Sequence, residues 1–128
     1  VDFLVVEGVG GLLAPMSESE LVADVACDLG FPLLLVARRS LGTINHTLLT
    51  LEAASKRGLA VAGIVLNQPL PTEVADLSVD SNAAELARRC AAPIIAILPH
   101  ETTAALRHPS PLSKIDWVQL MSAGSDAR

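Results

Sequence analysis

The chain has 128 residues, of which 51% are hydrophobic, 18% are charged and only 2% are aromatic. A chain of this length can bury a single aliphatic core without a disulfide or a metal to stabilise it. Its nine Lys and Arg residues and fourteen Asp and Glu residues give a net charge of −5. Because neutralising phosphates requires clustered Lys and Arg, we expect no nucleic-acid partner.

Cysteine spacing and hydropathy indicate the cellular compartment that we expect for this protein. Cys27 and Cys90 lie far apart, which predicts free thiols rather than a disulfide framework or a zinc site. No apolar run approaches the roughly 18 residues that a membrane-spanning helix requires, and no targeting segment is visible. We therefore expect a cytoplasmic protein with no membrane partner.

Four apolar runs rich in branched side chains predict strands buried on both faces. They are Phe3 to Val6, Leu33 to Ala37, Val61 to Leu66 and Pro93 to Leu98. The apolar spacing from Leu21 to Leu29 predicts a helix between the first two runs. Ser17 and Glu20 have the spacing of a capping box at its start, and Gly30 is typical of a helix end.

Two more helices are predicted further along the chain. One runs from about Thr43 to Arg57 and ends before Gly58. The other follows Asn82, with Glu85 completing a capping box. Strands that alternate with helices in this order indicate a parallel sheet with right-handed crossovers.

The predicted fold is therefore α/β, with a three-layer parallel sheet that carries helices on both faces, in a single domain over residues 1–128. Residues 67–81 form the longest predicted loop. Two segments of the tail, Thr102 to His108 and Leu112 to Met121, are candidates for short helices.

The first candidate site follows the first predicted strand, since ligands of open parallel sheets bind at the carboxyl ends of the strands. The sequence there is Glu7-Gly8-Val9-Gly10-Gly11. A carboxylate at this edge can hold Mg²⁺, and the glycines let backbone N–H groups approach anionic oxygens. A charged strand end followed by a flexible turn is the alternative interpretation.

The second candidate site is the turn from Ser40 to His46, which leads into the second helix. A helix N-terminus can receive a carboxylate or a phosphate, and Asn45 offers a side-chain donor. Taken alone, the turn is better explained by Thr43 as an N-cap and Asn45 as a solvated residue. His46 by itself is more typical of a structural or surface histidine than of a base.

The last two candidate sites follow the third and fourth predicted strands. Amide side chains of Asn67 and Gln68 can pair with the edge of an adenine ring, and the loop at Pro99 can cover its face. Asn is also a common turn residue. The 128 residues contain no G-x-x-x-x-G-K-[ST] phosphate-binding loop, no G-x-G-x-x-G fingerprint, no G-x-S-x-G elbow and no Cys/His cluster at metal spacing.

Four blocks, in order and at the family's spacing, resemble the dethiobiotin synthetase family. They are V-V-E-G-V-G-G-L-L-A-P at residues 5–15, P-L-L-L-V-A-R-R-S-L-G-T-I-N-H-T-L-L-T at 32–50, G-I-V-L-N-Q at 63–68 and I-L-P-H at 97–100. The resemblance covers residues 1–101 and leaves 102–128 as a C-terminal tail. It implies a P-loop NTPase-like domain and a homodimeric, ATP- and Mg²⁺-dependent cyclo-ligase of biotin biosynthesis. That enzyme closes the ureido ring of dethiobiotin from 7,8-diaminopelargonic acid, CO₂ and ATP.

The resemblance also implies roles for individual residues, none of them a catalytic side chain. Glu7 is the expected Mg²⁺ ligand. The expected nucleotide-binding residues are Glu7, Gly8, Val9, Gly10, Asn67, Gln68, Pro99, His100 and Glu101, with the last five on the adenine side. The residues expected to hold the substrate carboxylate, from a molecule bound in the partner subunit, are Gly42, Thr43, Ile44 and Asn45.

This chain departs from the family pattern in one large respect. The family's phosphate-binding loop and its lysines precede the first strand seen here, so we expect the N-terminal part of the domain to be missing and the 128 residues alone to be inactive. Gln68 replaces an acid of many relatives, and Glu101 replaces an apolar residue. The alternatives are a cobyrinate-type synthetase of the same superfamily and a catalytically silent half-domain.

Overall fold

A computed structural model describes residues 4–71, 78–100 and 110–123. Three parallel strands form its sheet: β1 (Leu33–Arg38), β2 (Val61–Asn67) and β3 (Ile94–Leu98). Their order is β1-β2-β3, so the middle strand pairs on both sides. All three were predicted from the sequence to within one residue at each end.

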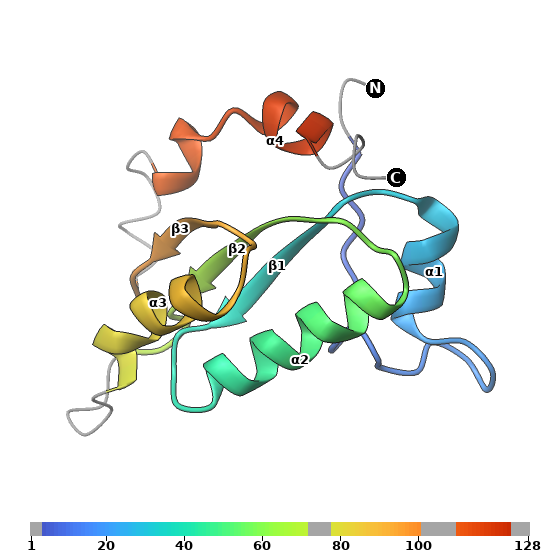
Figure 1. The fold of residues 1–128 in the computed structure, drawn as a ribbon, viewed down its shortest axis with the longest axis horizontal. Coiled ribbons are helices and arrows are strands. Elements are labelled where there is room, and N and C mark those ends of the chain that lie inside the picture. Colours follow the sequence, from blue (N-terminus) through green and yellow to red (C-terminus); the bar gives the residue numbers. More distant parts are fainter. Residues whose placement is uncertain (1–3, 72–77, 101–109, 124–128) are drawn as a thin grey trace.

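Helices lie on both faces of this sheet (Figure 1). α2 (Thr43–Lys56) packs against β1 and also against α3 (Ser78–Arg89), and α4 (Trp117–Ala123) packs against β2 from the opposite side. The 3₁₀ helix η2 (Pro111–Lys114) contacts β3. The predicted three-layer α/β fold is therefore confirmed.

The core lies where β2 meets the helices. Ile64, Leu66 and Leu86 are fully buried. The partly buried hydrophobic residues packed against these three are Leu35, Ala37, Ile44, Leu48, Leu51, Ala83, Cys90, Ala92 and Ile94. The central strand can be apolar along its whole length because both of its faces are covered.

The strand predicted at Phe3 to Val6 is wrong for its described part. Residues 4–8 have no strand assignment, and Leu4, Val5 and Val6 are 67%, 87% and 52% exposed. A strand gains stability from hydrogen-bonded neighbours and a covered face, and neither is present here. The segment is apolar, as a buried strand would be, but it forms no strand pairing with the described residues.

The starts of two helices also differ from the predictions. Ser17 Oγ accepts from Glu20 N at 3.1 Å, but the bond closes a separate turn, and α1 (Val22–Leu29) begins after Leu21. Asp24 Oδ2 accepts from Leu21 N at 2.7 Å and so supplies half of a capping box. Gly30 ends α1 with φ +64°, as predicted.

α3 begins at Ser78, four residues before the predicted cap, so Asn82 lies inside the helix and is only 1% exposed. Glu85 does not cap it either, because its carboxylate pairs with Arg88 and Arg89 on the helix surface. These residues have the composition of a helix start but lie in the second turn and beyond.

The remaining predictions for the second helix and the tail are mostly met. α2 runs from Thr43 to Lys56, and Lys56 Nζ lies 2.7 Å from Glu52 Oε1. The hydrogen bond and the charge of Lys56 lower the pKa of the Glu52 carboxyl. The segment Leu112 to Met121 is divided between η2 and α4, and Thr102 to His108 lies outside the described residues.

Close packing of β2 against β3 predicts the effect of Gly63→Ala. A Cβ at Gly63 would lie 2.8 Å from Ile95 Cγ2 and 3.3 Å from Pro93 O. Overpacking of this kind destabilises by about 1 to 3 kcal/mol. Urea unfolding should show that loss, whereas Gly11→Ala, whose Cβ would meet no atom within 4 Å, should change the free energy of unfolding far less. Equal effects of the two substitutions would contradict the packing.

Candidate functional site

The three strands end at one edge of the sheet because their register aligns their last residues. Arg38 pairs with Asn67, and Asn67 pairs with Leu98. The loops that follow the strands are joined by backbone hydrogen bonds, from Arg39 N to Asn67 O at 2.7 Å and from Gln68 N to Leu98 O at 3.0 Å. The predicted carboxyl-terminal edge is therefore a continuous surface.

The turn between β1 and α2 has a fixed geometry. Ser40 O accepts from Thr43 N at 3.2 Å, and Gly42, the N-cap of α2, has φ +90°. Thr43 is 4% exposed and is not the cap, so that alternative interpretation is wrong, whereas Asn45 is exposed. Thr43 N–H is taken by Ser40 O, but no side chain among the described residues caps α2, so other N–H groups of its first turn can bind an anionic ligand or water.

The loops after β2 and β3 bring the predicted adenine residues together. His100 Nδ1 lies 3.1 Å from Pro69 O, which joins the two loops. Gln68 is 9% exposed, and its Oε1 accepts from Arg39 Nη1 at 3.3 Å, while Asn67 is half-buried and Pro99 is exposed. Accessibility therefore favours Asn67 over Gln68 as a ligand contact. Glu101 lies outside the described residues.

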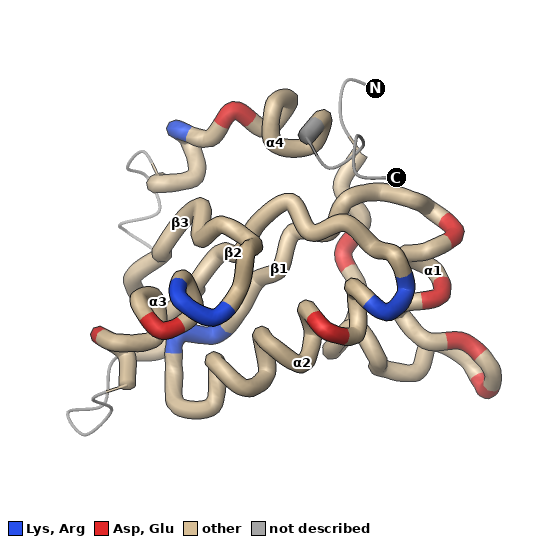
Figure 2. Tube along the Cα trace, viewed as in Figure 1, with Lys and Arg blue, Asp and Glu red and all other residues tan. Residues whose placement is uncertain are grey.

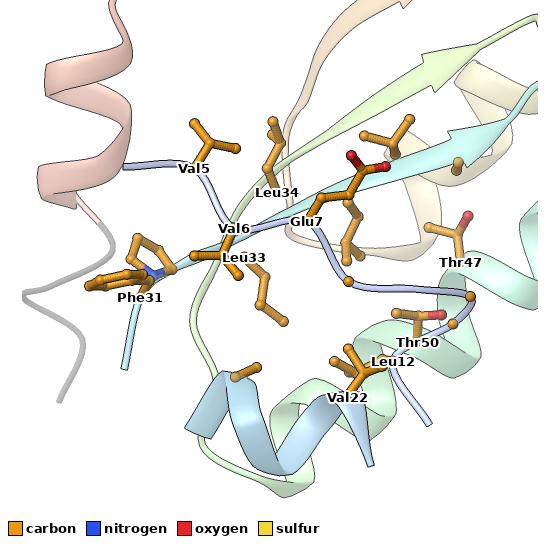
Figure 3. A pocket seen from close by; sticks show the side chains of 18 of the residues that line it. Val5, Val6, Glu7, Leu12, Val22, Phe31, Leu33, Leu34, Thr47 and Thr50 are labelled. Atoms are coloured by element: carbon orange, nitrogen blue, oxygen red, sulfur yellow. The ribbon is translucent and has the colours of Figure 1, made fainter. Parts of the chain in front are cut away.

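The glycine-rich segment lies on a large, mostly apolar cavity of about 1370 Å³. Glu7 lines it on the β1 side and Thr47 on the α2 side, as Figure 3 shows. Gly10 has φ +77°, a conformation that favours glycine, and a Cβ at Gly8 would lie 2.8 Å from Val22 Cγ1 and force Val22 to shift. The other residues of the candidate motifs that line this cavity are Gly8, Gly10, Gly11, Ser40, Leu41, Thr43 and His46.

The predicted residues thus fall into two groups. Glu7, Gly8, Gly10 and Thr43 share the cavity, whereas Val9 and the other predicted substrate residues, Gly42, Ile44 and Asn45, do not line it. The described adenine-side residues, Asn67, Gln68, Pro99 and His100, form the second group at the ends of β2 and β3 and do not line the cavity. Glu7 does not end a strand as expected, because residues 4–8 do not join the sheet.

Three polar residues of this region were missed by the sequence reasoning. At the end of the sheet, Arg39 donates a hydrogen bond to Val79 O and Asn82 donates one to Ser40 O. Thr47 Oγ1 is buried without a hydrogen-bond partner among the described residues. A basic segment at the end of β1, Arg38–Arg39 (Figure 2), was the one available sign of such a role. Asn82 was instead interpreted as a cap.

The carboxylate side chains of this region are compatible with a magnesium site that needs few protein ligands. Within the described ranges, no three His, Cys, Asp or Glu residues gather at one place. Mg²⁺ is commonly held by one or two carboxylates with phosphate oxygens and water, so the exposed Glu7 carboxylate fits that role. In the same part of the chain, no helix is both long and apolar enough to cross a bilayer.

Comparison with known proteins gives a family. Residues 1–105 match a family described as an AAA domain. The ATP-dependent dethiobiotin synthetase BioD of Anaeromyxobacter dehalogenans strain 2CP-1 is 55% identical over 104 residues, which are 81% of this chain and 46% of that relative.

Two more distant relatives carry the same name. That of Aromatoleum aromaticum is 41% identical over 115 residues, which are 84% of this chain and 50% of the relative. That of Thermodesulfovibrio yellowstonii is 41% identical over 108 residues, which are 79% of this chain and 45% of the relative. The chain spans about half the length of these curated relatives.

The unpaired hydroxyl of Thr47 predicts a gain in stability on its removal. A buried polar group without a hydrogen bond costs about 1 to 3 kcal/mol, so Thr47→Val should raise the free energy of unfolding in urea by about 1 kcal/mol. The matched control is Thr50→Val on the same helix, because Thr50 Oγ1 donates to His46 O at 2.8 Å. That variant should gain nothing. If Thr47→Val lowers the free energy of unfolding instead of raising it, the Thr47 hydroxyl is hydrogen-bonded.

Proposed function

The chain belongs to the AAA-domain family, and on that premise we propose that the full-length protein is an ATP-dependent dethiobiotin synthetase. The observation that carries the proposal is the shared edge at which β1, β2 and β3 end, with an uncapped helix N-terminus beside amide and proline residues. A relative with this name is 55% identical over 104 residues, which are 81% of this chain, and this supports the assignment.

In the proposed reaction, one amine of 7,8-diaminopelargonic acid adds to CO₂ to form a carbamate. ATP phosphorylates the carbamate oxygen, which releases ADP. The second amine then attacks the activated carbon, inorganic phosphate leaves with the C–O bond electrons, and the ureido ring of dethiobiotin closes. The chemistry depends on holding three reactants in register, so positioning is the main task of the protein.

Within that reaction, the adenine would lie against Asn67 and the loop at Pro99 and His100. The N–H groups of Gly8, Val9 and Gly10 would face phosphate or carbamate oxygens. The substrate carboxylate would bind at the start of α2, over Gly42 to Asn45, where the helix dipole favours an anion. Mg²⁺, held in part by Glu7, would supply positive charge to the transferred phosphoryl group.

We further propose that the enzyme is a cytoplasmic homodimer in which α2 meets the partner subunit. Leu49 is 56% exposed and follows Asn45 by four residues on the same side of α2, and Leu41, which precedes the N-cap of α2, is 83% exposed. Exposed apolar side chains around a polar ligand residue suit a subunit contact. The carboxylate held by Asn45 would then belong to the substrate of the other subunit.

A second candidate function is a catalytically silent module that only dimerises and binds part of a ligand. The 128 residues contain no phosphate-binding loop with its lysine, which favours this candidate for the chain as given. An assay separates the two candidates. Full-length protein that forms dethiobiotin from the diamine, CO₂ and Mg·ATP supports the enzyme, and no turnover supports the silent module.

The role of Glu7 predicts a loss of activity without a loss of stability. Glu7→Gln keeps the size of the side chain but removes its charge, so dethiobiotin formation should fall by about 100-fold or more. Glu18→Gln, an equally exposed change, should leave turnover unchanged. Since Glu7 is exposed, both variants should unfold at the wild-type urea midpoint. Wild-type turnover by Glu7→Gln at limiting Mg²⁺ would sink the metal-ligand role.

Asn45→Ala should weaken binding of the diamine alone. Losing a hydrogen bond to a charged group costs about 1.5 to 3 kcal/mol, so the KM for diaminopelargonic acid should rise roughly 10- to 150-fold. The KM for ATP should change little. Ser55→Ala, at the exposed far end of α2, is the matched control.

The same variant tests whether the site is shared between subunits. In a hybrid dimer of Asn45→Ala and Glu7→Gln subunits, one of the two sites would contain neither substitution. Activity should therefore reappear on subunit exchange. If mixing never restores activity, each site is built within one chain.

A further inference from the structure

The turn between β1 and α2 is tied to α3 by two reciprocal side-chain bonds. Asn82 Nδ2 of α3 donates to Ser40 O of the turn at 3.3 Å. Arg39 Nε of the turn donates to Val79 O of α3 at 3.1 Å. Each segment thus supplies one side-chain donor and one backbone acceptor, and we call these two bonds the turn clamp.

The turn clamp is shielded from water. Asn82 is 1% exposed, and the side chain of Arg39 is 19% exposed. Hydrogen bonds in such surroundings are stronger than at the surface, and a buried acceptor left without a hydrogen bond is unfavourable. The 3.7 Å ion pair of Arg39 with Asp80 adds little by comparison, because the Asp80 side chain is 97% exposed.

The turn clamp acts on the atoms that set the start of α2. Ser40 O, the acceptor for Asn82, also accepts from Thr43 N, so one carbonyl joins α3 to the first turn of α2. Arg39 reaches the other side of the edge as well, through its bond to Gln68 Oε1 at 3.3 Å. A shift of the turn would break bonds to both β2 and α3.

From this geometry we propose that Asn82 and Arg39 are positioning residues that fix the start of α2 relative to the end of β2. If the proposed function holds, on which this part rests, they set the location of Gly42 to Asn45 for the substrate carboxylate. Neither residue needs to touch the substrate. Small displacements of a binding group lower affinity steeply, so the clamp would govern the KM for the diamine.

Two variants and two controls test this role in the full-length protein. Asn82→Leu and Arg39→Met each remove one bond of the turn clamp. Ser81→Ala and Arg89→Met are the matched controls on α3, since Ser81 bonds only Ser78 within the helix and Arg89 pairs with Glu85 at the surface. The readouts are the KM values for diamine and ATP, the urea midpoint, and amide exchange by NMR.

The proposal predicts a rise of about tenfold in the diamine KM for Asn82→Leu, with the ATP KM within a factor of two. The Thr43 amide should exchange at least tenfold faster, while the Ile64 amide, bonded to Pro93 O at 2.8 Å in the core, keeps its wild-type rate. Arg39→Lys, which retains a donor, should fall between wild type and Arg39→Met. Both controls should match wild type in every readout.

The outcomes separate this proposal from the proposed function. A purely structural role would lower the urea midpoint and speed Thr43 and Ile64 exchange together, with an unchanged diamine KM, and that result would overturn the positioning role. If the wild-type protein makes no dethiobiotin, the proposed function fails. Selective exchange of Thr43 in Asn82→Leu would then still support the clamp, and its absence would overturn it.

Discussion

The pairing of β2 with a parallel strand on each side is the constraint on which the rest of the structure depends. Parallel strands all point the same way, so β1, β2 and β3 end together at Arg38, Asn67 and Leu98. The fully buried side chains of Ile64 and Leu66 pack against Leu86 and hold the central strand in place. Everything proposed for the ligand edge follows from that alignment.

Polar side chains beyond the strand ends turn this alignment into a defined surface. Arg39 and Asn82 bond the β1–α2 turn to α3, and His100 contacts Pro69 between the other two loops. The glycine-rich segment is different, because it contacts the cavity without joining the sheet. The adenine side of the proposed site is therefore held by described contacts, while the phosphate side is open and faces the cavity.

Local patterns predicted the elements whose stability is local. The runs that became β1, β2 and β3 were apparent from their branched side chains, and α2 from its periodicity and Gly58. Residues 4–6 have the same composition but pair with no strand in the described part of the chain, so composition misled there. The hydrogen bonds of Arg39 to Val79 and of Asn82 to Ser40 join residues that are 40 and 42 positions apart in the sequence. No sequence pattern predicts contacts between residues so far apart.

Hydrogen–deuterium exchange of the full-length protein, with ADP and with diaminopelargonic acid in turn, tests the shared ligand edge most directly. The account predicts that ADP protects the amides of Asn67, Gln68 and His100, and that the diamine protects Gly42 to Asn45. The opposite edge of the sheet, at Gly58 to Ala60 and Ala91 to Ala92, should exchange at the same rate with and without either ligand. Protection confined to that opposite edge would contradict the account.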